Sequence, residues 1–212
     1  IIKEESLFEG ENRVRTPEAG QWVLEGPGDA YTEGGQLVMV NPESGPDHLV
    51  LWLPRPYPDN ILIEFEITLE TADEGLAILF FSARPSAAHE GNIFMPGLAK
   101  RNGTFKNYIK GDIDSYHVSY LAADQHGQGL FGARRTANIR KNSGFWLVAC
   151  GDDQIQGKGR GAGPHLVRLL KMGSLIRIEA NHRLSASFDD DGKTWGPVWG
   201  DGYIGLRQMN NT

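Results

Sequence analysis

Hydrophobic and polar positions alternate with a period of two along most of the chain, and almost no stretch shows the 3.6-residue period of an amphipathic helix. In residues 61–67, isoleucine and phenylalanine alternate with leucine and glutamate, which is typical of a half-buried antiparallel strand. Residues 76–81 (LAILFF) and 145–150 (FWLVAC) are apolar at every position. We therefore expect these two runs in the middle of a sandwich.

Short extended runs recur along the chain, and clusters of Gly, Pro, Asn and Asp separate them. This spacing predicts an all-β fold in which two antiparallel sheets pack face to face, as one domain over residues 1–212. The longest piece without a strand pattern is 84–110, and a loop of that length in a compact domain is usually functional or mobile. The predicted strands lie in residues 21–26, 35–40, 47–53, 60–69, 76–83, 116–121, 137–140, 145–150, 165–172, 175–181, 183–189 and 203–209.

Two neighbouring runs, 115–121 and 135–141, each carry one apolar and one polar face. Side chains on a strand point alternately to opposite faces, so the faces follow from counting. A sheet built only for stability does not need an imidazole and a guanidinium together on its second face. The predicted polar face holds His117, Ser119, Asn138 and Arg140.

Composition excludes several classes of protein. The net charge of −6 argues against non-specific nucleic-acid binding, and no apolar run is long enough to span a membrane. The single cysteine, Cys150, cannot form an internal disulfide, and we expect it buried as a small hydrophobe. Because the chain starts at Ile1, we expect a processed or trimmed N-terminus, with any signal peptide upstream.

Common catalytic and metal motifs are not found in the sequence. It has no H-E-x-x-H, G-x-S-x-G or Walker-type motif, so we expect neither a metal nor a cofactor. Glu64 and Glu66 have the spacing of a hydrolytic pair, but they fall on the solvent side of an amphipathic strand. The D-x-G-x-T-W turn at 190–195 looks like an Asp-box hairpin, in which we expect aspartate to bind turn amides rather than Ca²⁺.

A group of basic and phenolic residues is the remaining candidate site. Neither His117 nor Arg140 has an evident acidic partner in the sequence, and an acidic sugar would supply the missing anion. The group comprises Arg101, Tyr108, His117, Tyr120, Asn138, Arg140, Lys141 and Arg207.

Several motifs resemble the YesU-type bacterial family, and the resemblance runs over nearly the whole chain. They are LFF (79–81), KRNGTF (100–105), GDIDSYHVSY (111–120), RTANIRKNSGF (135–145), DDGKTWGPV (190–198) and IGLRQM (204–209). The resemblance implies a concanavalin A-like jelly-roll sandwich. It also implies an oligosaccharide dehydratase that removes water from a non-reducing terminal uronic acid linked to rhamnose. Ulvan oligosaccharides are the first expected substrate class, and rhamnogalacturonan fragments are the next.

The residues present suit that chemistry. The C5 proton of a uronate leaves only when the carboxylate is neutralised and the developing enediolate is stabilised, and Arg140 and Asn138 suit this role. Donors placed where charge develops lower a barrier by about 3–4 kcal/mol each. His117 can transfer protons near neutral pH without a large pKa shift, and Tyr108 could be its partner if nearby cations lower its pKa. Which of the two is the base does not follow from the sequence.

The other members of the group are assigned to substrate binding. Arg101 and Arg207 would hold acid or sulfate groups, and Ser119 and Asn138 share the polar face. Strand counting puts Tyr120 on the apolar face unless a bulge turns it. Lys141 points away from Arg140, so we hold it in reserve.

Two further classes of function remain open. A carbohydrate-binding module would display aromatic platforms, for which Trp22, Trp52, Trp146, Trp195 and Trp199 are candidates. An endo-acting polysaccharide lyase would use the same elimination with a glycosidic oxygen leaving. We expect a periplasmic location, with the cytoplasm as the alternative, and the sequence leaves the oligomeric state open.

Overall fold

A computed structural model describes residues 22–41, 48–68, 75–123, 135–155 and 164–209. A seven-stranded antiparallel sheet has the order β1-β4-β13-β6-β7-β8-β9, and a four-stranded sheet has the order β12-β11-β10-β5. Strands β2 and β3 form a separate hairpin. The elements are β1 (Val23–Glu25), β2 (Asp29–Glu33), β3 (Gln36–Val40), β4 (Leu49–Trp52), β5 (Ile61–Ile67), β6 (Gly75–Pro85), α1 (Lys106–Ile109), β7 (Ile113–Ala123), β8 (Thr136–Asn142), β9 (Trp146–Asp152), β10 (His165–Met172), β11 (Leu175–Ala180), β12 (Arg183–Asp189) and β13 (Tyr203–Met209).

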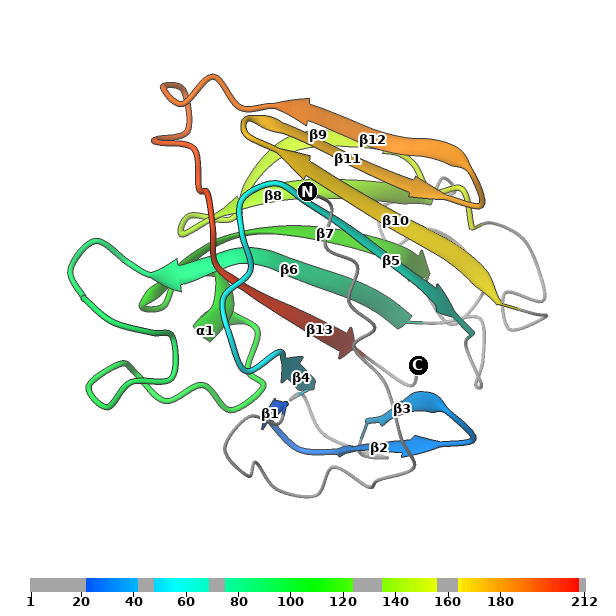
Figure 1. Cartoon of the computed structure of the whole chain (residues 1–212), viewed down its shortest axis with the longest axis horizontal. Helices are drawn as coiled ribbons and strands as arrows, with labels where there is room; N and C mark the ends of the chain where they lie inside the picture. Colours follow the sequence, from blue (N-terminus) through cyan, green and yellow to red (C-terminus); the bar gives the residue numbers. More distant parts are fainter. Residues whose placement is uncertain (1–21, 42–47, 69–74, 124–134, 156–163, 210–212) are drawn as a thin grey trace.

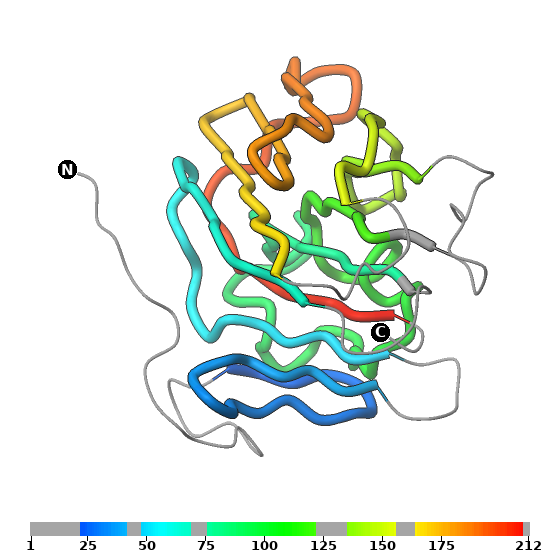
Figure 2. The backbone as a smooth tube through the Cα atoms, turned by 90° about the vertical axis from the view of Figure 1, so that its right-hand side faces the viewer, coloured from blue at the N-terminus to red at the C-terminus, as the bar shows by residue number. Residues whose placement is uncertain are grey.

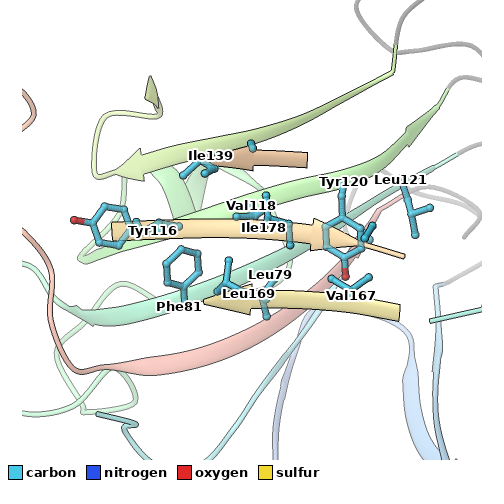
Figure 3. Close-up of a cluster of buried hydrophobic side chains, with 14 of the residues drawn as sticks. Leu79, Phe81, Tyr116, Val118, Tyr120, Leu121, Ile139, Val167, Leu169 and Ile178 are labelled. Atoms are coloured by element: carbon cyan, nitrogen blue, oxygen red, sulfur yellow. The ribbon is translucent and has the colours of Figure 1, made fainter. Parts of the chain in front are cut away.

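The two large sheets face each other and enclose the main hydrophobic core (Figure 1). Alternate residues of β7, among them Tyr116, Val118 and Tyr120, point into this core (Figure 3). Strand β5 alternates between half-buried and exposed positions along its whole length, as its sequence predicts. The two-sheet architecture is thus a direct consequence of the period-two pattern.

A second core covers the other face of the seven-stranded sheet. Residues 86–112, which include α1, lie against this face and contribute Ile93 and Tyr108, and β4 and β6 contribute Trp52 and Phe80. Strand β6 therefore has a core on both sides, which explains the apolar run at 76–81. The long loop predicted at 84–110 is a packed cover of the sheet.

The hairpin β2–β3 lies on the same side as this second core, away from the four-stranded sheet (Figure 2). Its first strand, β2, was not predicted from the sequence. Residues 29–33 read DAYTE, and three polar side chains in five residues hide the strand pattern. The Gly34–Gly35 turn, with positive φ at both residues, was the available signal.

Two expectations for the run at 145–150 are wrong. The strand β9 is the edge of the seven-stranded sheet rather than its middle, and Trp146 and Leu147 are 49% and 46% exposed. Cys150 on the same strand is exposed rather than buried. The prediction of burial was based on the apolar residues on both faces of this run. An edge strand such as β9 has a neighbouring strand on one side only, so its apolar side chains can remain exposed. Among the described residues, no helix is long and apolar enough to cross a membrane.

Candidate functional site

His117 and Arg140 lie directly opposite each other on β7 and β8, and Ser119 lies opposite Asn138 two residue pairs further along. All four side chains belong to the face of the sheet that carries the second core, as strand counting predicts. Across β6 and β13, the row of Ser119 continues to Arg207. The part of this sheet face formed by five residues is called the site face: His117, Ser119, Asn138, Arg140 and Arg207.

Three phenylalanine rings enclose the His117 imidazole, and the residue is 1% exposed. The ring centroid of His117 lies 5.3 Å from that of Phe80, 6.2 Å from that of Phe105 and 5.8 Å from that of Phe145, which is stacked on it. An apolar cage of this kind opposes a charge on the imidazole.

Asn142 fixes the orientation of the imidazole. Its Nδ2 atom lies 2.9 Å from His117 Nδ1 and 3.0 Å from Ser115 Oγ. With Nδ2 as the donor, His117 Nδ1 accepts and the ring proton lies on Nε2. Turning the amide over reverses these roles with the same partners, so Asn142 can hold either neutral tautomer of His117.

Burial lowers the pKa of His117 to about 3, and the charges of Arg140 and Arg207 contribute to the shift. The expectation that His117 titrates near neutral pH without a large shift is therefore wrong. Sequence reasoning placed two guanidinium groups near the imidazole but did not count their effect on its charge.

Arg140 is a partly exposed guanidinium with few partners. Its Nη1 donates to the carbonyl oxygen of Phe145 at 3.2 Å, and its Cζ lies 4.0 Å from the centre of the Phe145 ring. Within the part of the chain that the structure describes, no carboxylate pairs with it. Desolvation by burial lowers the pKa of Arg140, and an anion beside it would offset that effect.

Arg207 is buried beneath the cover formed by residues 86–112. Its Nη2 donates to Gly103 O at 2.9 Å, and its Cζ lies 4.9 Å from the Phe105 ring centre and 5.1 Å from that of Tyr108. At 2% exposure, Arg207 acts on the site through its charge. The predicted role of Arg207 in holding an acid or sulfate group of the substrate is not supported by this buried position.

The assignment of Tyr108 as a proton-transfer group is not supported. Tyr108 is fully buried, and its hydroxyl accepts a hydrogen bond from the Gly103 N–H at 3.1 Å. Burial, with a further contribution from Glu25, raises the pKa of Tyr108 rather than lowering it. The cation Arg207 is near, but its influence is smaller than the cost of removing the phenolate from water.

The structure also removes Arg101 from the substrate-binding group. Arg101 makes two hydrogen bonds to Glu25, at 3.1 Å from Nε and 2.6 Å from Nη2, and a third to Ile93 O at 2.7 Å. Its side chain is 6% exposed. A buried, bidentate ion pair of this kind leaves little of the guanidinium for a ligand.

Lys141 and Tyr120 lie on the opposite face of the sheet, in the main core. Lys141 Nζ donates to Asp190 Oδ2 at 2.6 Å, and the ring centroid of Tyr120 lies 6.5 Å from that of Phe65. The bulge that might have turned Tyr120 exists, but it lies after it, where Leu121 has a φ of 55°. Neither residue is placed to bind substrate on the site face.

Sequence reasoning missed Asn142, Phe105 and Phe145. All three lie inside the motifs KRNGTF and RTANIRKNSGF, so the signal was present, but aromatic and amide residues in turns carry no chemistry by themselves. Phe145 has a φ of 60°, a left-handed conformation that costs a residue with a Cβ about 1–2 kcal/mol. Strain of this kind tends to gather at functional sites.

Three acidic residues considered in the sequence analysis are engaged in structural contacts. Asp190 Oδ1 accepts from Gly192 N at 2.9 Å, and Asp191 Oδ1 accepts from Lys193 N and Thr194 N at 2.8 Å each, which confirms the expected role of the 190–195 turn. Glu64 pairs with Arg168 on the outer face of the four-stranded sheet. No group of three metal-ligating residues occurs among the described residues.

Comparison with known proteins identifies the family. The family model of a domain of unknown function, DUF1961, matches residues 7–212. The uncharacterized protein YesU of Bacillus subtilis strain 168 is 32% identical over 188 residues, which cover 89% of this chain and 82% of YesU. The chain belongs to the DUF1961 family. The predicted resemblance to YesU is confirmed.

Solved structures place this DUF1961 protein among all-β sandwiches of the galectin and concanavalin A type. A protein of unknown function with a galectin-like fold from Bacillus subtilis superposes with a TM-score of 0.79 at 30% identity, covering 98% of this chain and 92% of that one. Carbohydrate-binding module CBM66 from Bacillus subtilis has a TM-score of 0.53 at 14% identity, covering 89% and 87%. A β-glucanase from Bacillus licheniformis has a TM-score of 0.52 at 11% identity, covering 96% and 86%. The last two likenesses show the fold alone.

Proposed function

We propose that this DUF1961 protein is a dehydratase that removes water from the non-reducing terminal uronic acid of uronyl-rhamnose oligosaccharides of the ulvan type. The observation that carries the proposal is Arg140, a partly exposed guanidinium without a described carboxylate partner, directly opposite His117. The sugar-binding and glucanase proteins that share the fold support a carbohydrate ligand.

Arg140 is suited to bind the uronate carboxylate. A guanidinium has five N–H donors in a planar fork, and only one hydrogen bond of Arg140, to Phe145 O, is formed within the described part of the chain. A carboxylate can take two of the remaining donors side by side. This pairing neutralises the sugar carboxylate and makes the C5 proton easier to remove.

His117 is the proton-transfer group in this proposal. When a carboxylate binds Arg140, it cancels one of the charges that lower the pKa of His117, so the imidazole becomes a better base as the substrate arrives. The side chain is 1% exposed, so a sugar reaches Nε2 by displacing the ring of Phe105 or Phe145. In this proposal the His117 imidazole is therefore a stronger base in the substrate complex than in the free protein.

The elimination balances with one shuttled proton. His117, held in the Nδ1–H tautomer by the Asn142 carbonyl oxygen, takes the C5 proton at Nε2 and leaves an enediolate beside Arg140. The C4–O4 bond then breaks, and the imidazolium returns the proton to O4. One water leaves, and the C4–C5 double bond of a 4,5-unsaturated uronate remains.

Ser119 and Asn138 supply neutral hydrogen bonds next to this pair. Asn138 is 5% exposed and donates to Thr136 Oγ1 at 3.2 Å. Ser119 is 6% exposed, and its hydroxyl makes no side-chain hydrogen bond to the described residues. Both lie two residue pairs along the strands from His117 and Arg140, on the same face. We assign them to the substrate hydroxyl groups and to the developing enediolate oxygen.

Incubation with saturated uronyl-rhamnose oligosaccharides tests the proposal, with mass spectrometry and the absorbance of the unsaturated uronate as readouts. We expect loss of one water from an intact oligomer, and no turnover in Arg140→Gln or His117→Phe. Arg177→Gln is the matched control, because Arg177 lies on the four-stranded sheet. Chain shortening would indicate a polysaccharide lyase instead. Binding without new absorbance would indicate a carbohydrate-binding module.

A further inference from the structure

Two tryptophans form an exposed pair at one end of the sandwich. Trp146 begins β9 and is 49% exposed, and Trp195 lies in the turn that follows β12 and is partly exposed. The ring centroids are 5.3 Å apart, and the ring planes are inclined by 35°. The two indoles together form what we call the tryptophan platform.

The backbone around Trp195 is fixed from both sides. Before it, Asp191 accepts hydrogen bonds from Lys193 N and Thr194 N at 2.8 Å each and from Thr194 Oγ1 at 2.6 Å. After it, the buried Lys141 ammonium donates to the carbonyl oxygens of Gly196 at 3.0 Å and Pro197 at 2.7 Å. Trp195 therefore sits on a turn that hydrogen bonds hold on both sides of it.

Trp146 is held by the turn that precedes it. A Cβ on Gly144 would lie 2.2 Å from Trp146 Nε1, so the indole lies in space that only glycine leaves open. The next residue, Phe145, offers its carbonyl oxygen to Arg140. The same turn thus carries Trp146 on one side and contacts the site face on the other.

The fold gives no reason for leaving this pair in solvent. The other described tryptophans serve the interior: Trp52 is buried and donates to Glu25 at 2.9 Å, Trp199 donates to Asn142 O at 3.2 Å, and Trp22 packs against the main core. Two rigid aromatic rings present a large contact area to a ligand at little cost in conformational entropy. No described cation lies over either indole, which suits an uncharged ligand.

We infer that the tryptophan platform binds an uncharged pyranose ring. The C–H groups on one face of a pyranose carry partial positive charge and match the negative face of an indole. Trp146 lies opposite Lys141, on the side of the sheet away from Arg140, so a chain whose acidic end lies at Arg140 passes over the turn at 143–145 to reach the platform. The inference rests on the proposed function for the identity of that acidic end, and the bound ring is a neutral sugar further along the same oligosaccharide.

Chain-length dependence of binding tests the inference. Dissociation constants are measured by calorimetry for a saturated uronyl-rhamnose disaccharide and for the corresponding tetrasaccharide, with His117→Phe in every protein to prevent turnover. We expect the tetrasaccharide to bind at least about tenfold more tightly, a gain of about 1.4 kcal/mol. Trp146→Ala and Trp195→Ala should each remove this gain and leave disaccharide binding unchanged.

Three further variants keep the outcomes separate. Leu184→Ala removes a side chain that is 47% exposed on β12, and it should keep the gain, as should Trp146→Phe in part. Arg140→Gln should weaken the disaccharide and tetrasaccharide alike. If Arg140→Gln has no effect and the tryptophan variants lose the gain, the platform stands and the proposed function fails. The inference is overturned if both tryptophan variants keep the gain, or if no oligosaccharide binds the protein.

Discussion

His117 is an imidazole that the protein keeps uncharged. Three phenylalanines exclude water from it, and two arginines oppose a proton on it. Such an imidazole is a poor base until a nearby anion raises its pKa. The same features that make His117 a weak base in the free protein make it responsive to an acidic ligand.

Stability at acidic pH reports this arrangement. The folded-state pKa of His117, about 3, lies below the ordinary value near 6.5, so the unfolded chain binds the proton more tightly. Its contribution to stability is therefore complete above about pH 6.5 and is lost as the pH falls towards about 3. Between about pH 7 and about pH 4.5 the loss amounts to about 2–3 kcal/mol.

We expect this loss to be absent from His117→Phe, in which a fourth ring fills the cage, when urea denaturation is measured at both pH values. His182→Asn, which changes an exposed histidine in the turn between β11 and β12, should keep the wild-type pH dependence. Equal pH slopes for His117→Phe and the wild type would contradict the buried, uncharged imidazole.

The positions of some site residues could be predicted from the sequence, and those of others could not. Counting along two strands placed His117, Ser119, Asn138 and Arg140 on one face, because strand periodicity is local. It could not find Glu25 beside Arg101, since those residues are 76 positions apart. Nor could it show that Tyr108 lies in a dry core, because burial depends on the cover that folds over it.

At the level of elements, the cover formed by residues 86–112 determines which groups on the site face remain accessible. Gly103 lies at its centre: the N–H donates to the Tyr108 hydroxyl, and the carbonyl oxygen accepts from Arg207. A Cβ at Gly103 would lie 2.0 Å from His48 O, and the residue has a φ of +93°. Only glycine allows the cover to approach the backbone at His48 so closely.

Gly103→Ala should therefore destabilise the protein by about 3 kcal/mol or more in urea denaturation, because backbone strain and steric overlap add. Gly97→Ala is the matched control, since Gly97 has a φ of +105° and nothing within 4 Å of the added Cβ. It should cost only the strain, about 1–2 kcal/mol. Equal losses in the two variants would mean that the cover tolerates displacement from the sheet.

Strands were predicted where their side chains follow the period of the pleat. Strands β5 and β7 were found for that reason, whereas β2 was missed because its polar residues lie on a small hairpin outside the sandwich. The position of β9 was wrong because hydrophobic content does not tell an edge strand from a central one. Strand order depends on contacts between distant segments, and the sequence pattern alone does not contain it.

Across the whole molecule, the face of the seven-stranded sheet opposite the site face carries a buried ion pair that joins distant segments. Facing the main core, Asp190 Oδ2 accepts hydrogen bonds from the Tyr116 hydroxyl and the Lys141 ammonium. Burial alone would raise the pKa of Asp190, but the hydrogen bonds from Lys141 and Tyr116 outweigh it and hold the pKa below its usual value. These contacts connect β7 and β8 to the segment that follows β12.

Lys141→Met leaves the buried Asp190 carboxylate without its cation, and we expect a loss of about 3–5 kcal/mol in urea denaturation. Lys193→Met, at an exposed position in the neighbouring turn, should change stability by less than about 0.5 kcal/mol. Binding of glucuronate by folded Lys141→Met should equal that of the wild type, because Lys141 points away from the site face and a single sugar does not extend to the tryptophan platform. Weakened binding in the folded variant would return Lys141 to the site.

Titration of the His117 imidazole by NMR, with and without a saturating uronate, tests most directly whether a carboxylate binds Arg140 next to His117. The account predicts that glucuronate raises the pKa of His117 from about 3, because the carboxylate offsets the charge of Arg140. Uncharged glucose should leave the pKa unchanged, and Arg140→Gln should abolish the response to glucuronate. An unchanged pKa in saturating glucuronate, or the same rise in Arg140→Gln, would contradict the account.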